Sequence, residues 1–180
     1  MSLAPQDAID ALRAVDETDA TSRTLHGYNV AAPHMILWGC AYAAGYSYGY
    51  LRPENAGAVW LVLVPLAIIG DVMLSGSRES GAKWQIFAGL MATFLAFITA
   101  TATIMQPHDP RQMAAFVPIL VGCCYIVLGI GAGRRLVLTG IALFALTLLG
   151  FFAFPSIFLL WMAVVGGGGL ILGGLWLRQV

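Results

Sequence analysis

Charged residues are scarce in this sequence. Only 10% of its 180 residues are Asp, Glu, Lys or Arg, whereas 59% are hydrophobic, and the mean hydropathy is +0.83. A soluble domain of this size would lack the polar atoms needed to cover its surface. The nine basic and nine acidic residues balance, so there is no basic field for nucleic acid. The composition therefore predicts a protein that lies in the lipid bilayer and does not bind nucleic acid.

Residue patterns that carry chemistry are also lacking. Cys40, Cys123 and Cys124 lie in apolar segments without a C-x-x-C or Cys/His spacing, which argues against a disulfide framework and a zinc site. No paired carboxylates, histidine cluster or nucleophile beside a base can be assembled. We therefore expect no cofactor, no metal and no enzymatic activity. The chain does not open with a basic segment followed by an apolar one, so no cleavable signal peptide is expected.

Six apolar segments follow a polar amino-terminal region. They cover residues 33–51, 57–74, 84–105, 113–130, 136–152 and 156–177, and each approaches the ~20 residues that a helix needs to cross a bilayer. We predict an all-α integral membrane bundle of six transmembrane helices over residues 32–180. Residues 1–31 are predicted to form a cytoplasmic or interfacial amphipathic helix, because Ile9, Leu12 and Val15 recur every three residues among charged neighbours. That helix either rests on the protein's own cytoplasmic face or docks a partner.

Basic residues predict the orientation of the bundle. With six crossings, seven lysines and arginines fall on the face that holds both termini, and only Arg52 and Arg111 fall on the other. Lysine and arginine are retained on the cytoplasmic side of a membrane. The amino and carboxyl termini are therefore both expected in the cytoplasm.

A short signature occurs twice in the last third of the chain. The pattern V-G-x5-L-G-x4-R covers residues 121–134 and again residues 165–178, at the ends of two spans that run in the same direction. With the glycines of 140–178 and the Phe154-Pro155 hairpin, this carboxyl-terminal part resembles the small six-helix bacterial membrane proteins of the HdeD acid-resistance type. The resemblance implies a stress-related, multi-pass protein of the bacterial inner membrane, with no catalytic residues to carry over.

Small residues at four-residue spacing predict where helices pack closely. Ala41, Gly45 and Gly49 form one such stripe, and Gly169 and Gly173 form another. We favour packing within the bundle over a dimerisation face. The run of four glycines at 166–169 goes beyond what packing needs, and it predicts a bend or the close approach of a ligand.

One carboxylate lies well inside a predicted span. Asp71 is therefore functional by default, because an unpaired charge in hydrocarbon is costly. It lies near the cytoplasmic end, however, where Arg78, Lys83, Arg134 and Arg135 are all expected. We favour a structural ion pair with one of them over a proton or cation site.

Hydroxyl groups and one histidine complete the candidate positions. Tyr42 and Tyr46 share a helix face, and with Thr99 and Thr103 they could line a polar cavity. Threonine in a membrane helix usually bonds back to its own carbonyls, which disfavours that cavity. His34 is expected to be an interfacial hydrogen-bonding residue rather than a metal ligand.

The function predicted from these observations is non-catalytic. We expect an integral inner-membrane protein with a scaffold, accessory or stress-related regulatory role. The alternative is a small transporter or channel for a neutral or weakly polar solute, proton-linked through Asp71. Apart from the lipid bilayer, the expected partners are another membrane protein or a second copy of the chain.

Overall fold

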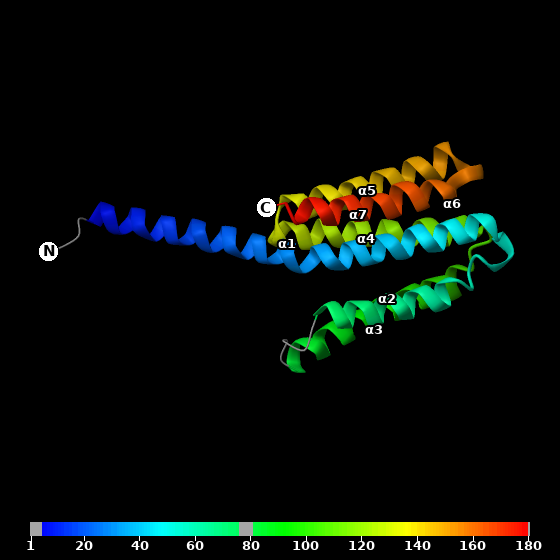
Figure 1. The fold of residues 1–180 in the computed structure, drawn as a ribbon, viewed down its shortest axis with the longest axis horizontal. Coiled ribbons are helices and arrows are strands. Elements are labelled where there is room, and N and C mark those ends of the chain that lie inside the picture. The colour runs from blue at the N-terminus through cyan, green and yellow to red at the C-terminus, as the bar shows by residue number, and fades with distance from the viewer. Residues whose placement is uncertain (1–4, 76–80, 180) are drawn as a thin grey trace.

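The computed structural model describes residues 5–75 and 81–179, and this part of the chain is helical, without a strand (Figure 1). Its elements are α1 (Pro5–Leu51), η1 (Pro53–Asn55), α2 (Trp60–Ser75), α3 (Gly81–Met105), α4 (Pro110–Ala132), α5 (Arg134–Ala153), η2 (Pro155–Ile157), α6 (Phe158–Trp161), η3 (Met162–Gly167) and α7 (Gly168–Leu177). Within the described residues, four stretches are long and apolar enough to cross a membrane, namely Ala88–Met105, Pro110–Ala132, Arg134–Ala153 and Pro155–Leu177. The predicted all-α fold is confirmed, with four helices that are suited to span a membrane.

The first two predicted spans are not among these four stretches. Residues 33–51 do not form a separate helix, because α1 has 47 residues and runs through Pro33 and across the predicted boundary at 31–32. Proline removes one backbone hydrogen bond there without ending the helix. The second segment forms α2, which has 16 residues. Such a helix rises only about 24 Å, less than the roughly 30 Å of a hydrocarbon core.

The carboxyl-terminal half of α1 packs with α4, α5 and the last span, Pro155–Leu177. Helix α4 lies against α5, and α1 lies along η3 and α7 (Figure 1). A single residue, Gly133, joins α4 to α5, and its φ of 124° is one that favours glycine. The largest fully buried side chains of this group include Met35, Phe158, Met162 and Leu170.

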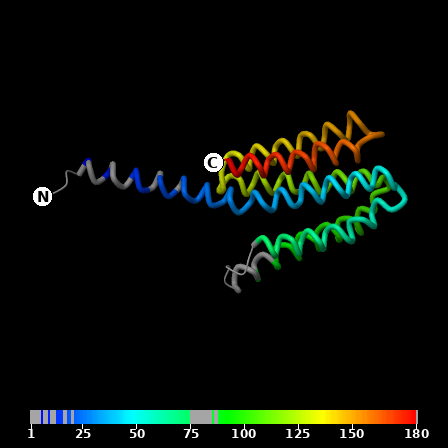
Figure 2. Tube along the Cα trace, in the orientation of Figure 1, coloured from blue at the N-terminus to red at the C-terminus, as the bar shows by residue number. Residues whose placement is uncertain are grey.

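Helices α2 and α3 lie on the side of α1 away from α5 and α7 (Figure 2). Helix α2 contacts α1, whereas no residue of the α3 stretch Ala88–Met105 is buried. The ring of Phe97 packs near that of Phe116 on α4, with 6.2 Å between the ring centroids. The outer surface of α3 is therefore left to the lipid or to a neighbour.

A close backbone contact joins α1 to the last span. A Cβ added to Gly167 would lie 2.7 Å from the backbone nitrogen of Ala43, and one added to Gly39 would lie 2.8 Å from the backbone oxygen of Gly167. A Cβ on Gly174 would similarly meet the backbone oxygen of Ala32 at 2.8 Å. We call these five residues the α1–α7 seam. Backbones this close gain dispersion and Cα–H···O contacts that lipid cannot supply.

The predicted small-residue stripes have other neighbours. Gly45 lies against the ring of Trp60, and Gly49 lies against Ala56. Gly173 packs against Thr139 of α5, which agrees with packing inside the bundle. Gly169 makes no close helix contact, since an added Cβ would find no atom within 4 Å. The partly buried Ala41 belongs to neither the seam nor a close glycine contact.

The glycine run overlaps an irregular turn of the last span. Residues Met162–Gly167 form the π-helix η3, whose turn includes one more residue than a turn of α-helix. The α-helix resumes at Gly168. At this point Gly167 lies against the backbone of Ala43. The sequence predicted a bend or a close ligand approach, and the structure has a π-helical turn at which another helix approaches.

Candidate functional site

Asp71 is almost fully buried, with 2% of its surface exposed, on the α2 face that meets α1. Its Oδ1 is 2.7 Å from the Nδ1 of His34, and its Oδ2 accepts a hydrogen bond of 2.7 Å from the indole Nε1 of Trp38. His34 and Trp38 are four residues apart on α1, so they lie on one face of that helix. Both carboxylate oxygens are therefore bonded by nitrogens of the neighbouring helix.

These two partners differ from the basic residues that the sequence analysis favoured. Arg78 and the side chain of Lys83 lie outside the described residues. Arg135 donates instead to the backbone oxygen of Trp176 at 2.7 Å, and its guanidinium lies 5.1 Å from the centre of that indole ring. The signal for the α1 partners was present as H-x3-W, two nitrogen donors one turn apart at the depth of Asp71.

Tyr42 and Tyr46 lie in the core between α1, α2 and α4. Their rings pack edge to face at 5.4 Å, and both meet the ring of Trp60, at 5.9 Å and 5.1 Å. The Tyr46 hydroxyl donates to the backbone oxygen of Ala114 at 2.7 Å. These tyrosines therefore fasten α2 and α4 to α1 at the end of the bundle opposite Asp71.

The structure does not bring the two threonines to these tyrosines. Thr99 and Thr103 are exposed on α3, and their hydroxyls donate to the backbone oxygens of Leu95 and Thr99, each at 2.8 Å. Their polar groups are thus satisfied within their own helix. The four residues do not form a shared hydroxyl-lined cavity, the alternative that the sequence analysis disfavoured.

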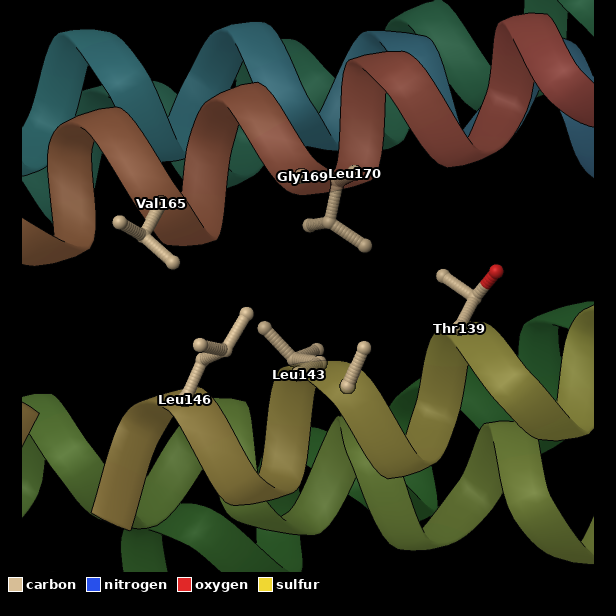
Figure 3. Close-up of a pocket in the computed structure, with 7 residues that line it drawn as sticks. Thr139, Leu143, Leu146, Val165, Gly169 and Leu170 are labelled. Atoms are coloured by element: carbon tan, nitrogen blue, oxygen red, sulfur yellow. The ribbon is translucent and has the colours of Figure 1, made fainter. Parts of the chain in front are cut away.

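A small apolar cleft lies between α5 and the last span (Figure 3). Its volume is about 40 Å³, and it is lined by Thr139, Ala142, Leu143, Leu146, Val165, Gly169 and Leu170. The hydroxyl of Thr139 is already engaged, since it donates to the Arg135 backbone oxygen at 3.0 Å. The space is comparable to that of one water molecule or methyl group, so it does not suit a solute.

No family model, curated protein or solved structure matches the chain. The likeness to HdeD-type proteins stays a prediction. Among the residues that the structure describes, no group of three or more His, Cys, Asp or Glu could hold a metal ion. The Asp71 group is thus the site whose geometry offers the most chemistry, because a buried carboxylate and an imidazole share a hydrogen bond there.

The two ends of the bundle are fastened by polar contacts of different kinds. At the end near Asp71, the hydroxyl of Tyr28 accepts a 3.0 Å hydrogen bond from the backbone N–H of Arg135. At the opposite end, Arg111 donates to Asp109 at 2.8 Å and to the backbone oxygen of Pro155 at 3.0 Å. The hydrogen bonds from Arg111 hold the pKa of Asp109 below its usual value.

Proposed function

We propose that this chain is a non-catalytic membrane protein that presents a helical arm to a partner, as a scaffold, accessory or regulatory subunit. The arm is residues 5–23 of α1. The observation that carries the proposal is the continuity of α1, whose second half packs in the bundle while its first half extends past it (Figure 1). Nineteen helical residues reach about 28 Å from the bundle.

The root of the arm is firmly held. Gly27 lies against Ala132 at the end of α4, and Tyr28 is bonded to the first turn of α5. All side chains of the arm that the structure describes are exposed, including those of Ile9 at 50% and Val15 at 58%. An arm resting on the protein's own cytoplasmic face would cover part of this surface. Exposed apolar side chains on a projecting helix suit a groove on another protein.

The proposal includes six crossings with both termini in the cytoplasm of a bacterium. Residues 33–51 of α1 lie beside the last span, and α2 lies beside them, so both are proposed to cross with it. A bilayer thinned around α2 would accommodate its 16 residues. The exposed Arg134 and Arg178 lie at the end of the bundle from which the arm extends, which supports a cytoplasmic arm.

Photo-crosslinking in intact cells tests the arm. A photoreactive amino acid at Ile9 or Val15 should give the same discrete adduct with another protein, whereas the same probe at Ile104, exposed on α3, should label lipid. A second arm substitution, Val15→Asp, should abolish the adduct formed from position 9. An adduct of twice the chain's mass would identify a second copy as the partner. Arm probes that label only lipid or their own bundle would contradict the proposal.

A second candidate is a small transporter or channel for a neutral or weakly polar solute, linked to protons through Asp71. The hydrogen bond between the buried carboxylate and His34 favours it, because such groups mark proton relays in membranes. Proteoliposomes containing a pH-sensitive dye separate the two candidates. A transporter should carry protons with its solute and lose this flux in Asp71→Asn, whereas a scaffold should carry none in either form.

A further inference from the structure

We propose that Asp71, His34 and Trp38 form a proton-binding site, in which His34 exchanges the proton with the medium and passes it to Asp71. We call these three residues the proton site. The proposal is independent of the arm and of solute transport, since a scaffold can also bind a proton. It rests on the different exposure and chemistry of His34 and Trp38, which both bond the carboxylate.

The carboxylate of Asp71 is shielded from the medium, whereas the imidazole of His34 is partly exposed. The side chain of Asp71 is 3% exposed, whereas that of His34 is 23% exposed. The indole N–H of Trp38 only donates a hydrogen bond and does not release its proton. Trp38 can therefore hold the carboxylate of Asp71 in place but cannot transfer a proton to it. An imidazole has two nitrogens and titrates near neutral pH. His34 is thus a partner of Asp71 that can both reach the medium and carry a proton.

The hydrogen bond also fixes the direction of transfer. A carboxylate only accepts, so the Nδ1 of His34 carries the hydrogen and the lone pair of a neutral ring lies on Nε2. A proton from water adds to Nε2, and the proton on Nδ1 moves to Oδ1 of Asp71. The products are a neutral imidazole and a neutral carboxylic acid, with one proton taken up in all. Release follows the reverse steps.

Some of the helices near the site carry other titratable residues and some carry none. Besides Asp71, helix α2 contains no titratable residue, and neither do α6, η3 and α7. On α4, the hydroxyl of Tyr125 lies within electrostatic range of Asp71. His34 is six residues from Tyr28, which meets the start of α5, so the site lies about 9 Å from that end of the bundle. This depth keeps His34 within reach of interfacial water.

Infrared spectroscopy of the full-length protein in lipid nanodiscs tests the proposal. The carbonyl band of a protonated carboxylic acid should appear on acidification and be missing in Asp71→Asn. After a rapid pH jump, His34→Gln should slow the appearance of this band by about 100-fold, as expected for loss of a positioned acid–base group. Trp38→Phe is the matched control, because it also removes one N–H donor to Asp71 but leaves the proton route intact.

The outcomes are distinct. Equal slowing in Trp38→Phe and His34→Gln, or no slowing in either, would show that His34 merely holds the carboxylate. A carboxyl band that never appears would show that Asp71 does not take up the proton. If His34→Gln does not fold, the double variant His26→Gln/His108→Gln leaves His34 as the one histidine. Nitrogen NMR of that protein should then show the hydrogen of His34 on Nδ1 before proton uptake and on Nε2 after it, and a ring that is protonated on both nitrogens after uptake would overturn the proposal.

Discussion

Two adjacent glycines in the last span should respond in opposite ways to the same substitution. Gly167 has φ −65° and ψ −53°, and Gly168 has φ −61° and ψ −40°, so alanine fits the backbone of either residue without strain. A Cβ on Gly167 would meet the nitrogen, Cα and Cβ of Ala43 at 2.7, 2.9 and 2.9 Å. A Cβ on Gly168 would find no atom within 4 Å. Gly168→Ala is thus a matched control for Gly167→Ala.

The expected size of the difference follows from these contacts. Replacing glycine by alanine in a helix gains up to about 1 kcal/mol of propensity, and both variants receive this gain. Forcing extra volume into a packed contact costs about 1–3 kcal/mol. Gly168→Ala should therefore be neutral or slightly stabilising, while Gly167→Ala should be less stable than it by about 1–3 kcal/mol. Adding Ala43→Gly should restore only part of this loss, because two of the three closest atoms belong to the backbone.

Reversible unfolding in mixed micelles, followed by circular dichroism, measures this difference directly. The α1–α7 seam should also loosen in Gly167→Ala, which hydrogen exchange of residues 36–43 would detect. Equal stability of the two alanine variants would refute the close contact between α1 and the last span. It would also remove the basis for placing residues 33–51 beside that span.

Polar contacts at the two ends of the bundle give further predictions. Because Arg111 lowers the pKa of Asp109, the protein should lose stability as the pH falls below the usual aspartate value of about 3.9. Thermal unfolding of Arg111→Gln should lack that part of the pH dependence, and an unchanged pH profile would contradict the ion pair. Tyr28→Phe removes the acceptor of the Arg135 amide and should cost about 1 kcal/mol. Amide exchange in the first turn of α5 should then accelerate while α3 is unaffected.

Hydropathy located the apolar helices because it reports the solvent of each segment. The predicted spans 113–130, 136–152 and 156–177 lie in stretches that are long and apolar enough to cross a membrane, and most of the predicted span 84–105 lies in a fourth such stretch, Ala88–Met105. Hydropathy does not locate helix ends where the composition changes within one continuous helix. Helix α1 continues across residues 31–32 as one helix of 47 residues, so the change in composition there does not coincide with a helix end.

The sequence identified one member of the carboxylate site, Asp71, but not its partners on α1. Asp71 was identifiable because a charged residue in an apolar segment is costly wherever it lies. The H-x3-W pattern of His34 and Trp38 was present but could not be assigned to Asp71, because depth along the membrane normal is readable from the sequence, whereas the choice of neighbouring helix is not. The sequence pointed to arginines and lysines at that depth, of which Arg78 and the side chain of Lys83 lie outside the described residues, and the structure adds His34 and Trp38 of α1 as hydrogen-bond partners.

Small residues show why packing partners are harder to predict than helices. A glycine stripe can leave room for a backbone or for a ring, and four-residue spacing does not separate these uses. Gly45 makes room for the ring of Trp60, whereas Gly39 admits the backbone of the last span. The π-turn at Met162–Gly167 then shifts the helix phase, so that Gly167 rather than Gly169 faces α1. A stripe read with a constant period of 3.6 residues cannot anticipate that shift, and for this reason the adjacent pair at 167 and 168 is the sharpest test of the arrangement.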